Sequence, residues 1–354
     1  MSTTRYHTTE KTLISLLDRI HGSLAAACIA DALGAPTEER SVPEIRSLFT
    51  GPVEEFYAPL PDAPYAKGRF AGQYTDDSSQ MLMLAEVFID GDGVASPEAV
   101  AKMILAWSEK PEYYPHFAGP TTRRAIDRLR EGADPWEVGK AGRIMTEGSS
   151  NGGAMRIAPA GLVNPGNIEA AVRAAHLTCV PSHHTNIGVA GAGAVAAAIS
   201  AAMVDGATLL DVVRAARAGA VLGDHLGAEH GRVVAGPDVA RRIDIAVDAA
   251  MRSDSMESAV EEIVALIGTG LPAAEACPAA IGFFVAAGGD PWKTAVLCAN
   301  AGGDSDTVGC MAAAIAGAYT GIAAVPQDKY QQMLQANELD LASVASRLTA
   351  VVNN

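Results

Sequence analysis

The sequence predicts an all-α fold, a single-domain bundle of many helices that spans residues 1–354. Two features of the composition favour this class: the chain holds 68 alanines and 35 glycines, whereas aromatic residues make up only 5% of it. A core of such small side chains suits closely packed helices better than an aromatic-rich sandwich. The third feature is periodicity, because apolar residues recur at steps of three and four along most of the chain, as on one face of a helix.

The periodic segments are the expected helices. In chain order they are 13–28, 80–89, 97–107, 168–176, 187–203, 209–221, 238–251, 256–267, 306–318, 327–335 and 339–352. Alternation typical of strands is nearly absent, and only residues 53–56 suggest a short strand. The run Gly191-Ala192-Gly193 imitates a dinucleotide-binding fingerprint, but no strand precedes it, so we expect tight helix packing there.

Three stretches rich in proline and glycine, at 51–72, 110–120 and 142–153, are expected to be long loops. The first two carry Tyr and Phe, which either stack on a ligand or fill gaps in the core. No linker long enough to separate two domains interrupts the helical pattern, and no repeat of fixed period is visible. The sequence therefore predicts one domain that is larger than most.

Charge, hydropathy and cysteine usage bear on partners and location. With 26 Lys and Arg against 41 Asp and Glu, the net charge is -15, which disfavours nucleic-acid and anionic-membrane partners. The apolar runs at 187–204 and 310–325 consist mainly of Ala and Gly and are too weakly hydrophobic for membrane spans. The five cysteines are widely spaced and form no CxxC pair, so no disulfide framework is expected. With a polar first segment unlike a signal peptide, these features predict a reduced, cytoplasmic protein.

Two acidic turns hold the densest clusters of oxygen ligands. Thr75-Asp76-Asp77-Ser78-Ser79 and Gly302-Gly303-Asp304-Ser305-Asp306-Thr307 each come directly before an expected helix. Asp, Ser and Thr at that position often act only as N-caps, and this interpretation stays open for either turn alone. One capping residue suffices, however, and contiguous carboxylates repel one another unless a cation neutralises them. Oxygen ligands without Cys or paired His favour Mg²⁺ or Mn²⁺, and two such turns together would suit a binuclear site.

Four short motifs follow one another along the chain. They are Asp31-Ala-Leu-Gly-Ala-Pro-Thr-Glu38, Thr75-Asp76-Asp77, Asn151-Gly-Gly-Ala-Met-Arg156 and Gly302-Gly-Asp-Ser-Asp-Thr307. Their order and separations resemble those of the ADP-ribosylglycohydrolase family over about residues 18–325. Each motif is weak alone, but four in this order are specific. The resemblance implies an all-α fold with a binuclear centre of two divalent cations, Mg²⁺ or Mn²⁺.

The resemblance also implies the roles of single residues. Glu38 matches an acidic residue implicated in metal binding and catalysis, and Glu38, Asp76 and Asp77 are the candidates for activating the attacking water. Without the resemblance, Glu38 is typical of a solvated carboxylate near a helix end. The implied metal ligands, besides Glu38, are Thr75, Asp76 and Asp77 in a first group and Asp304, Asp306 and Thr307 in a second.

A glycine-rich loop at residues 148–152 and a histidine segment at residues 182–184 are the expected substrate contacts. Small residues let backbone N–H groups approach an anion such as a diphosphate, although a flexible surface connection is the alternative. In Ser182-His183-His184, the resemblance implies that His183 binds substrate, whereas a histidine at a helix start is more often a capping or packing residue. His184 is additional to the family pattern. The loop residues are Gly148, Ser149, Ser150, Asn151 and Gly152.

The predicted activity is hydrolysis of the ribosyl glycosidic bond in mono-ADP-ribosylated proteins or small ribosylated molecules. The resemblance favours modified arginine over modified serine as the substrate, and the net charge disfavours poly(ADP-ribose). The loops at 51–72 and 110–120 are expected to roof a pocket for one ADP-ribose unit. Two alternatives stay open: a nucleosidase-like N-ribosidase acting on a small metabolite, and a non-catalytic ADP-ribose-binding or crystallin-like protein.

Overall fold

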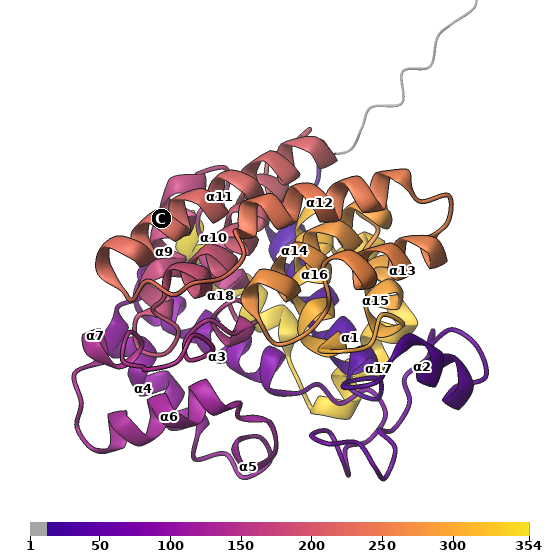
Figure 1. Ribbon diagram of the computed structural model, residues 1–354. Coiled ribbons are helices and arrows are strands. Elements are labelled where there is room, and N and C mark those ends of the chain that lie inside the picture. Colours follow the sequence, from indigo (N-terminus) through magenta and orange to yellow (C-terminus); the bar gives the residue numbers. More distant parts are fainter. Residues whose placement is uncertain (1–12, 354) are drawn as a thin grey trace, which may run out of the picture.

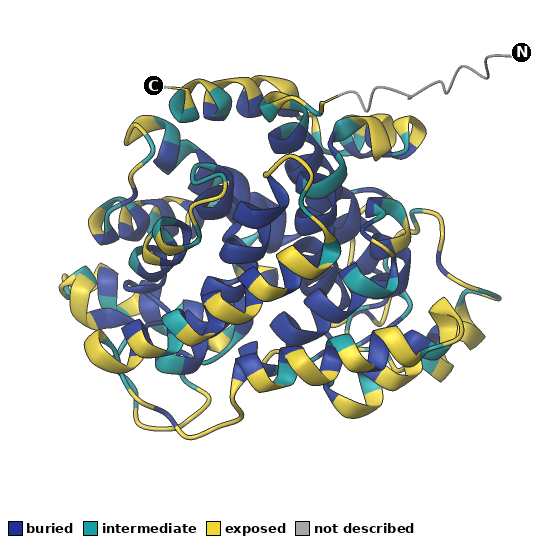
Figure 2. Ribbon diagram, turned by 90° about the horizontal axis from the view of Figure 1, so that it is seen from above, coloured by how far each residue is buried: buried dark blue, intermediate teal, exposed yellow. Residues whose placement is uncertain are grey.

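A computed structural model describes residues 13–353, in which eighteen α-helices are the dominant elements. These residues form no β-strand, only two isolated bridges, Ser150 with Pro272 and Thr185 with Arg232. Four long helices rich in small residues lie toward the middle of the molecule (Figure 1), and Figure 2 shows that the central helices are buried while outer helices expose one face. The predicted all-α class is confirmed. The four central helices are α1 (Leu16–Gly34), α10 (Asn186–Ala202), α14 (Ala273–Ala286) and α16 (Ser305–Thr320).

The remaining elements surround these four helices. Between α1 and α10 in the chain they are α2 (Val42–Leu48), α3 (Asp76–Asp90), α4 (Pro97–Trp107), α5 (Tyr114–Phe117), α6 (Pro120–Arg130), α7 (Pro135–Val138), α8 (Ala158–Leu162) and α9 (Ile168–Cys179). After α10 in the chain they are α11 (Leu209–His230), α12 (Val239–Arg252), α13 (Met256–Leu266), α15 (Pro291–Ala299), α17 (Gln327–Asn337) and α18 (Leu341–Val352). Two short 3₁₀ segments, Asn151–Gly153 and Ile322–Ala324, complete the described chain.

Every helix expected from periodicity is present, although several ends differ. The largest difference is α11, which continues to His230, nine residues beyond the predicted end at 221. The expected strand at 53–56 is wrong: Val53 donates its N–H to the Asn300 side-chain oxygen at 2.8 Å and accepts from the Asn300 amide nitrogen at 3.0 Å. Helix α14 escaped prediction because it is apolar on all sides and contains Pro278, so it shows no amphipathic period.

Small residues allow the central helices to approach closely. A Cβ atom at Gly22 of α1 would lie 2.6 Å from the Gly317 carbonyl oxygen of α16, and one at Gly193 of α10 would lie 2.8 Å from the Gly219 oxygen of α11. These separations are too short for any side chain. The glycines at 191–193 therefore serve helix packing, as expected, and the high alanine and glycine content is explained by these crossings.

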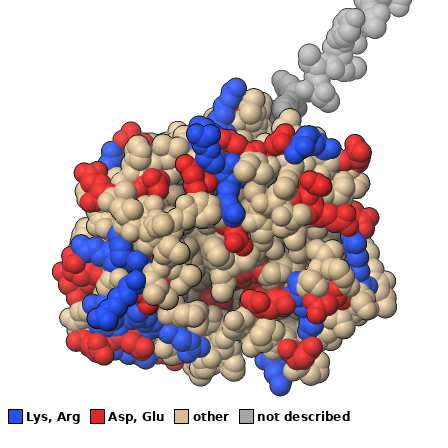
Figure 3. All heavy atoms as spheres, viewed as in Figure 1, with Lys and Arg blue, Asp and Glu red and all other residues tan. Residues whose placement is uncertain are grey.

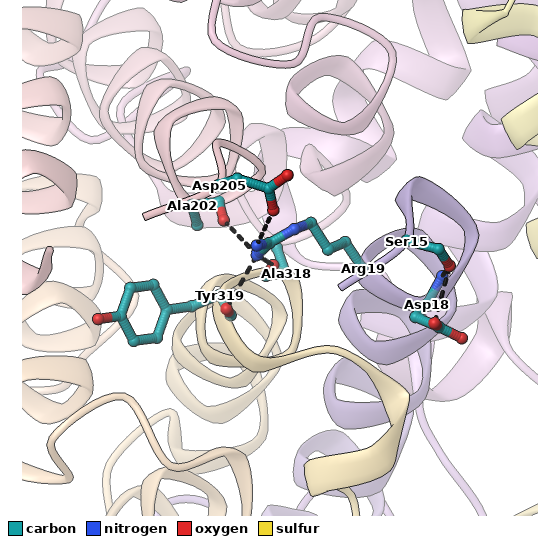
Figure 4. Close-up of polar contacts among 7 residues, drawn as sticks. All are labelled: Ser15, Asp18, Arg19, Ala202, Asp205, Ala318 and Tyr319. Carbon is teal, nitrogen blue, oxygen red and sulfur yellow. Dashed lines mark hydrogen bonds and ion pairs between the residues drawn. The ribbon is translucent and has the colours of Figure 1, made fainter. Parts of the chain in front are cut away.

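A buried arginine joins three helices at the start of α1 (Figure 4). Arg19 is only 5% exposed, and its guanidinium donates to the carbonyl oxygens of Ala202 and Ala318 at 3.0 Å each and of Tyr319 at 2.9 Å. It also donates to Asp205 at 2.8 Å. The three carbonyls lie at the C-terminal ends of α10 and α16, where a positive charge is favourable. Arg19 therefore fixes α1 against both helices.

The structure shows where the cysteines, the apolar runs and the charged side chains lie. All five cysteines are free thiols in buried positions. The apolar runs form α10 and α16, and no helix within residues 13–353 combines the length and hydropathy that crossing a membrane requires. Figure 3 shows acidic and basic side chains interspersed on one face, with Lys and Arg gathered mainly near α6.

Candidate metal centre

The two acidic turns meet at the end of α1. Thr75 and Asp76 begin α3, Asp304 and Asp306 begin α16, and Asp31 lies in the last turn of α1. Two groups of three carboxylates have one oxygen from each member within 4.8 Å of the others. One group is Asp31, Asp77 and Asp306, and the other is Glu38, Asp304 and Asp306. Asp306 belongs to both, so the groups adjoin.

Asp31 holds the first acidic turn in place. It is completely buried and accepts hydrogen bonds from the backbone N–H and hydroxyl of Thr75 at 2.9 and 2.8 Å, and from the Ser78 N–H at 2.9 Å. An aspartate of another helix thus binds the free N–H groups at the start of α3. Neither Thr75 nor Asp304, the residues at the N-cap positions, makes a side-chain capping bond. The capping interpretation therefore fails for both positions.

The segment after α1 is joined to the second turn by backbone hydrogen bonds. The Glu39 N–H donates to the Gly303 oxygen at 2.7 Å, and the Gly303 N–H donates to the Arg40 oxygen at 3.0 Å. The Asp304 N–H donates to the Thr269 oxygen at 2.7 Å. These bonds place Glu38 beside Asp304, although the two residues are far apart in the sequence.

Burial and mutual repulsion dominate the electrostatics. Burial raises the pKa of Asp31 and Asp304. Burial together with the charges of neighbouring carboxylates raises the pKa of four further acids, Glu38, Asp76, Asp77 and Asp306, well above the usual range. After burial, the largest contribution comes from Asp304 for Glu38 and from Glu38 for Asp306. Within residues 13–353, no Lys, Arg or His forms an ion pair with any of the six. A bound cation would remove this repulsion. The six are Asp31, Glu38, Asp76, Asp77, Asp304 and Asp306.

The donor set fits a hard divalent cation. Asp77 Oδ1 and Glu38 Oε2 are buried oxygens without a hydrogen-bond partner, a costly state for protein atoms alone. The Thr307 side chain opposes the rise in pKa of both Asp77 and Asp304, so its hydroxyl belongs to the same cluster. Asp76 is only partly buried and belongs to neither three-carboxylate group. Oxygen ligands of this kind suit Mg²⁺ or Mn²⁺.

The glycine-rich loop reaches the centre through Asn151, whose side-chain amide donates to Asp304. His183 lies behind the loop with no exposed surface. Its Nδ1 and Nε2 atoms lie 2.9 and 3.0 Å from the hydroxyls of Ser182 and Ser150. A Cβ atom at Gly152 would lie 2.8 Å from His183 Nε2, so glycine is needed there.

The remaining predicted loop residues are fixed within the protein. Gly148 has a φ of +79°, which favours glycine, and its oxygen accepts from the Thr185 hydroxyl at 2.7 Å. The Ser149 hydroxyl donates to the Met145 oxygen at 2.6 Å. The loop is thus anchored at both ends, which the alternative of a flexible connection does not explain.

The two aromatic loops meet beside the centre. Ala66 of the first loop and Phe117 of α5, the short helix within the second segment, form a small apolar cluster with Ala35. The Arg69 guanidinium lies 5.0 Å from the centre of the Tyr113 ring and 5.4 Å from that of Phe117. After burial, the charges of Glu39 and Glu38 raise the pKa of Tyr65, which places this tyrosine near the carboxylates.

Sequence reasoning missed the roles of two buried charges. Asp31 was recognised as part of a motif, but its position inside an apolar helix was the signal that it serves a site. Arg156, also fully buried, donates to Gln80 at 2.8 Å and to Ser182 at 2.7 Å. Burial lowers the pKa of Arg156 to about 10. This arginine connects α3 to the histidine segment.

The chain combines an all-helical fold with a buried carboxylate cluster that fits divalent cations, and comparison with known proteins gives its class, a hydrolase of glycosidic bonds. A sequence model of the ADP-ribosylglycohydrolase family matches residues 12–354, so the chain belongs to this family of glycoside-cleaving enzymes. A solved structure described as an ADP-ribosylglycohydrolase-related protein complex matches 95% of this chain and 99% of its own, with a TM-score of 0.70 and 23% identity. That likeness shows the shared fold.

Curated relatives cover nearly the same length. The chain is 31% identical over 335 residues to the uncharacterized protein YegU of Escherichia coli (strain K12), covering 94% of this chain and 96% of that protein. It is 26% identical over 349 residues to ADP-ribosylhydrolase ARH3 of Bos taurus, covering 92% and 91%. The ARH3 of Homo sapiens is 25% identical over 344 residues and covers 92% of each chain.

Proposed function

We propose that the protein hydrolyses the bond between ribose and its acceptor in mono-ADP-ribosylated substrates, with modified arginine preferred. The observation that carries this proposal is the pair of three-carboxylate groups that share Asp306 next to the loop containing Asn151. Cleavage of a ribosyl bond passes through an oxocarbenium-like state, which requires an activated water and a positioned sugar. The family match supports this reaction class, and the ADP-ribosylhydrolases ARH3 among the relatives support the substrate class.

Two divalent cations, Mg²⁺ or Mn²⁺, would supply the chemistry of binding vicinal ribose hydroxyls and lowering the pKa of a water. Their proposed ligands are Thr75, Asp76, Asp77, Asp304, Asp306 and Thr307, with Glu38 at the edge. Asp31 orients the first group through its bonds to the turn at Thr75. Asn151 orients Asp304 by donating to it.

Glu38 is the proposed proton acceptor for the attacking water. Its Oε2 atom has no hydrogen-bond partner within the protein, and it lies in the same group as Asp304 and Asp306. A carboxylate in that position can take the proton of the water as the ribosyl bond breaks. Asp76 and Asp77 are the alternative acceptors.

The loop of residues 148–152 is the proposed diphosphate site, with His183 supporting it through Ser150. The loops at 51–72 and 110–120 would cover the adenosine part, with Tyr65 exposed on that side and Phe117 packed between the loops. The five free thiols support the expectation of a reducing, cytoplasmic setting.

The test is a side-by-side assay of ADP-ribosyl-arginine, ADP-ribosyl-serine and a panel of free nucleosides, with Mg²⁺, with Mn²⁺ and with a chelator. We expect release of free ADP-ribose from the arginine substrate, and loss of turnover with the chelator. Asp306→Ala should lower the bound-metal stoichiometry more than Asp248→Ala, which removes an exposed carboxylate of α12. Cleavage of a nucleoside with none of either ADP-ribosyl substrate would instead identify an N-ribosidase. Unchanged metal content in Asp306→Ala would refute the metal assignment.

A further inference from the structure

A chain of hydrogen bonds runs through the protein from Arg156 to the glycine-rich loop at residues 148–152. The Arg156 guanidinium donates to the Ser182 hydroxyl oxygen at 2.7 Å, and that oxygen lies 2.9 Å from His183 Nδ1. On the other side of the ring, His183 Nε2 lies 3.0 Å from the Ser150 hydroxyl oxygen. Arg156, Ser182 and His183 are at most 1% exposed, so bulk water does not complete their hydrogen bonds.

The direction of these hydrogen bonds follows from the first donor. A guanidinium group has only N–H donors, so the Ser182 oxygen is the acceptor in its bond to Arg156. Within residues 13–353, His183 Nδ1 is the one other side-chain partner of this hydroxyl. A buried hydroxyl that leaves its hydrogen unpaired costs stability. The Ser182 hydroxyl therefore donates its hydrogen to Nδ1, which accepts with its lone pair.

The His183 ring then holds its proton on Nε2. Burial, and then the charge of Arg156, lower the pKa of His183 well below its usual range, so the ring is neutral and has one N–H. Because Nδ1 is an acceptor, Nε2 is the donor, and it donates to the Ser150 oxygen. Ser150 is half-buried, and no protein acceptor within residues 13–353 meets its own hydrogen. That hydrogen is therefore available to a ligand.

We propose that Arg156 and Ser182 are positioning residues, which fix the proton of His183 on Nε2 and thereby direct the Ser150 hydrogen toward a phosphate oxygen of the substrate. This inference rests on the proposed function, because it names the side-chain donor that the diphosphate site at residues 148–152 would offer. A phosphate oxygen is negatively charged and only accepts hydrogen bonds, so a hydroxyl with a fixed hydrogen suits it. Without the chain, the same hydroxyl could instead donate to the His183 ring.

The surroundings of the chain favour an anion next to Ser150. Arg156 forms no ion pair within residues 13–353, so its positive charge acts on the hydroxyls and the ring beside it. Helix α6 begins next to the loop, where the Thr121 hydroxyl accepts from the Gly148 N–H at 3.3 Å. A helix N-terminus adds partial positive charge. Both effects strengthen the binding of a phosphate relative to that of a neutral group.

Nuclear magnetic resonance of Mg²⁺-loaded protein with ¹⁵N-labelled histidine measures the proton position directly. The His183 signals are identified by their absence from His183→Gln, and they should show a protonated Nε2 and an unprotonated Nδ1. Ser150→Ala should keep this pattern, because the direction of the bonds is set from Arg156. Ser182→Asp supplies a carboxylate, which only accepts hydrogen bonds and can pair with Arg156, so a proton should appear on Nδ1.

Calorimetric titration with ADP-ribose and with adenosine measures the contribution of the Ser150 hydrogen. Ser150→Ala should weaken ADP-ribose binding by roughly ten- to a hundredfold, the cost of one lost hydrogen bond to a charged group. The affinity for adenosine, which has no phosphate, should be unchanged. Ser200→Ala is the control, because it removes a serine hydroxyl of α10 that donates to the Asn164 oxygen, and it should bind ADP-ribose like wild type.

Four results would overturn the proposal. They are a proton on His183 Nδ1 in wild type, an unprotonated Nδ1 in Ser182→Asp, unchanged ADP-ribose affinity in Ser150→Ala, and equal weakening of ADP-ribose and adenosine binding in that variant. Failure of the proposed function is a separate outcome. Wild type that binds ADP-ribose but cleaves no ribosyl substrate would refute the proposed function, while the ring proton and the two affinities would still support the hydrogen-bond chain.

Discussion

The two ends of helix α1 differ in how many partners the buried charged groups there have. At its start, the Arg19 guanidinium has three carbonyl oxygens and one carboxylate as acceptors. At its end, Asp31 faces Asp77 and Asp306, and Glu38 follows a few residues later with a buried oxygen that has no partner. The start of the helix therefore carries a buried charge with several partners, whereas its end lies beside Glu38 and Asp77, each of which has a buried oxygen without one.

This difference distinguishes buried charges that stabilise the fold from buried charges that a bound ligand would compensate. A buried charge that is paired and hydrogen-bonded costs stability when one partner is removed. A cluster of like charges costs stability while it is present, and a bound cation would offset that cost. Substitutions at the two ends should therefore have different consequences, for activity at one end and for folding at the other.

The largest expected effect is on turnover at the acidic end. Glu38→Gln keeps the shape of the side chain but removes the base, so kcat should fall by roughly two to four powers of ten. Binding of ADP-ribose and the free energy of unfolding should change little. Glu39→Gln, which alters the exposed neighbour, is the matched control and should keep its activity. A near-normal rate for Glu38→Gln would show that Glu38 is not the base and would leave Asp76 or Asp77 as the acceptor of the proton from the attacking water.

A smaller effect, on stability alone, is expected at the Arg19 end. Arg19→Met leaves buried acceptors unpaired and should lower the free energy of unfolding by about 3–5 kcal/mol. Urea denaturation should give the same loss with Mg²⁺ and with a chelator, because this end binds no metal. Arg347→Met, which breaks an exposed pair with Glu86, should cost about 0–1 kcal/mol. Equal losses in the two variants would contradict the structural role of Arg19.

The smallest effect concerns the pH dependence of stability without metal. The pKa of Asp77 is raised in the folded protein, so the folded state binds the proton more tightly than the unfolded state. The resulting stability is complete below about pH 4, the unfolded pKa of Asp, and is lost as pH rises through the folded pKa. Chelated protein should therefore lose more melting temperature with rising pH than Mg²⁺-loaded protein.

Asp77→Asn provides the control for this pH dependence. The variant removes one titrating group, so the chelated protein should show a flatter dependence of melting temperature on pH. The buried histidines titrate equally in both proteins, and their contribution cancels in the difference. Identical curves for chelated wild type and Asp77→Asn would show that this carboxylate carries no excess charge in the folded state.

Local patterns predicted much of the fold and part of the site. The amphipathic period identified α3 and α16, and therefore the acidic turns in front of them, because helix and turn signals depend on neighbouring residues. The contact between Asp31 and Thr75 was not predictable from such patterns, since it depends on how α1 packs. The stacking of His176 on His230 is likewise not predictable from neighbouring residues, since it depends on how α9 packs on α11.

Gly34, at the end of α1, allows the first turn of α16, with Asp306, to lie close to Asp31. A Cβ atom there would lie 2.5 Å from the backbone nitrogen of Asp306, so the first turn of α16 touches the α1 backbone. Adding a methyl group at position 34 would push Asp306 away from Asp31 and widen the space between their oxygens. Mg²⁺ demands oxygens at about 2.0–2.1 Å, whereas Ca²⁺ accepts about 2.3–2.6 Å. Gly34→Ala should therefore favour the larger Ca²⁺ over Mg²⁺ among the ions that the carboxylates can bind.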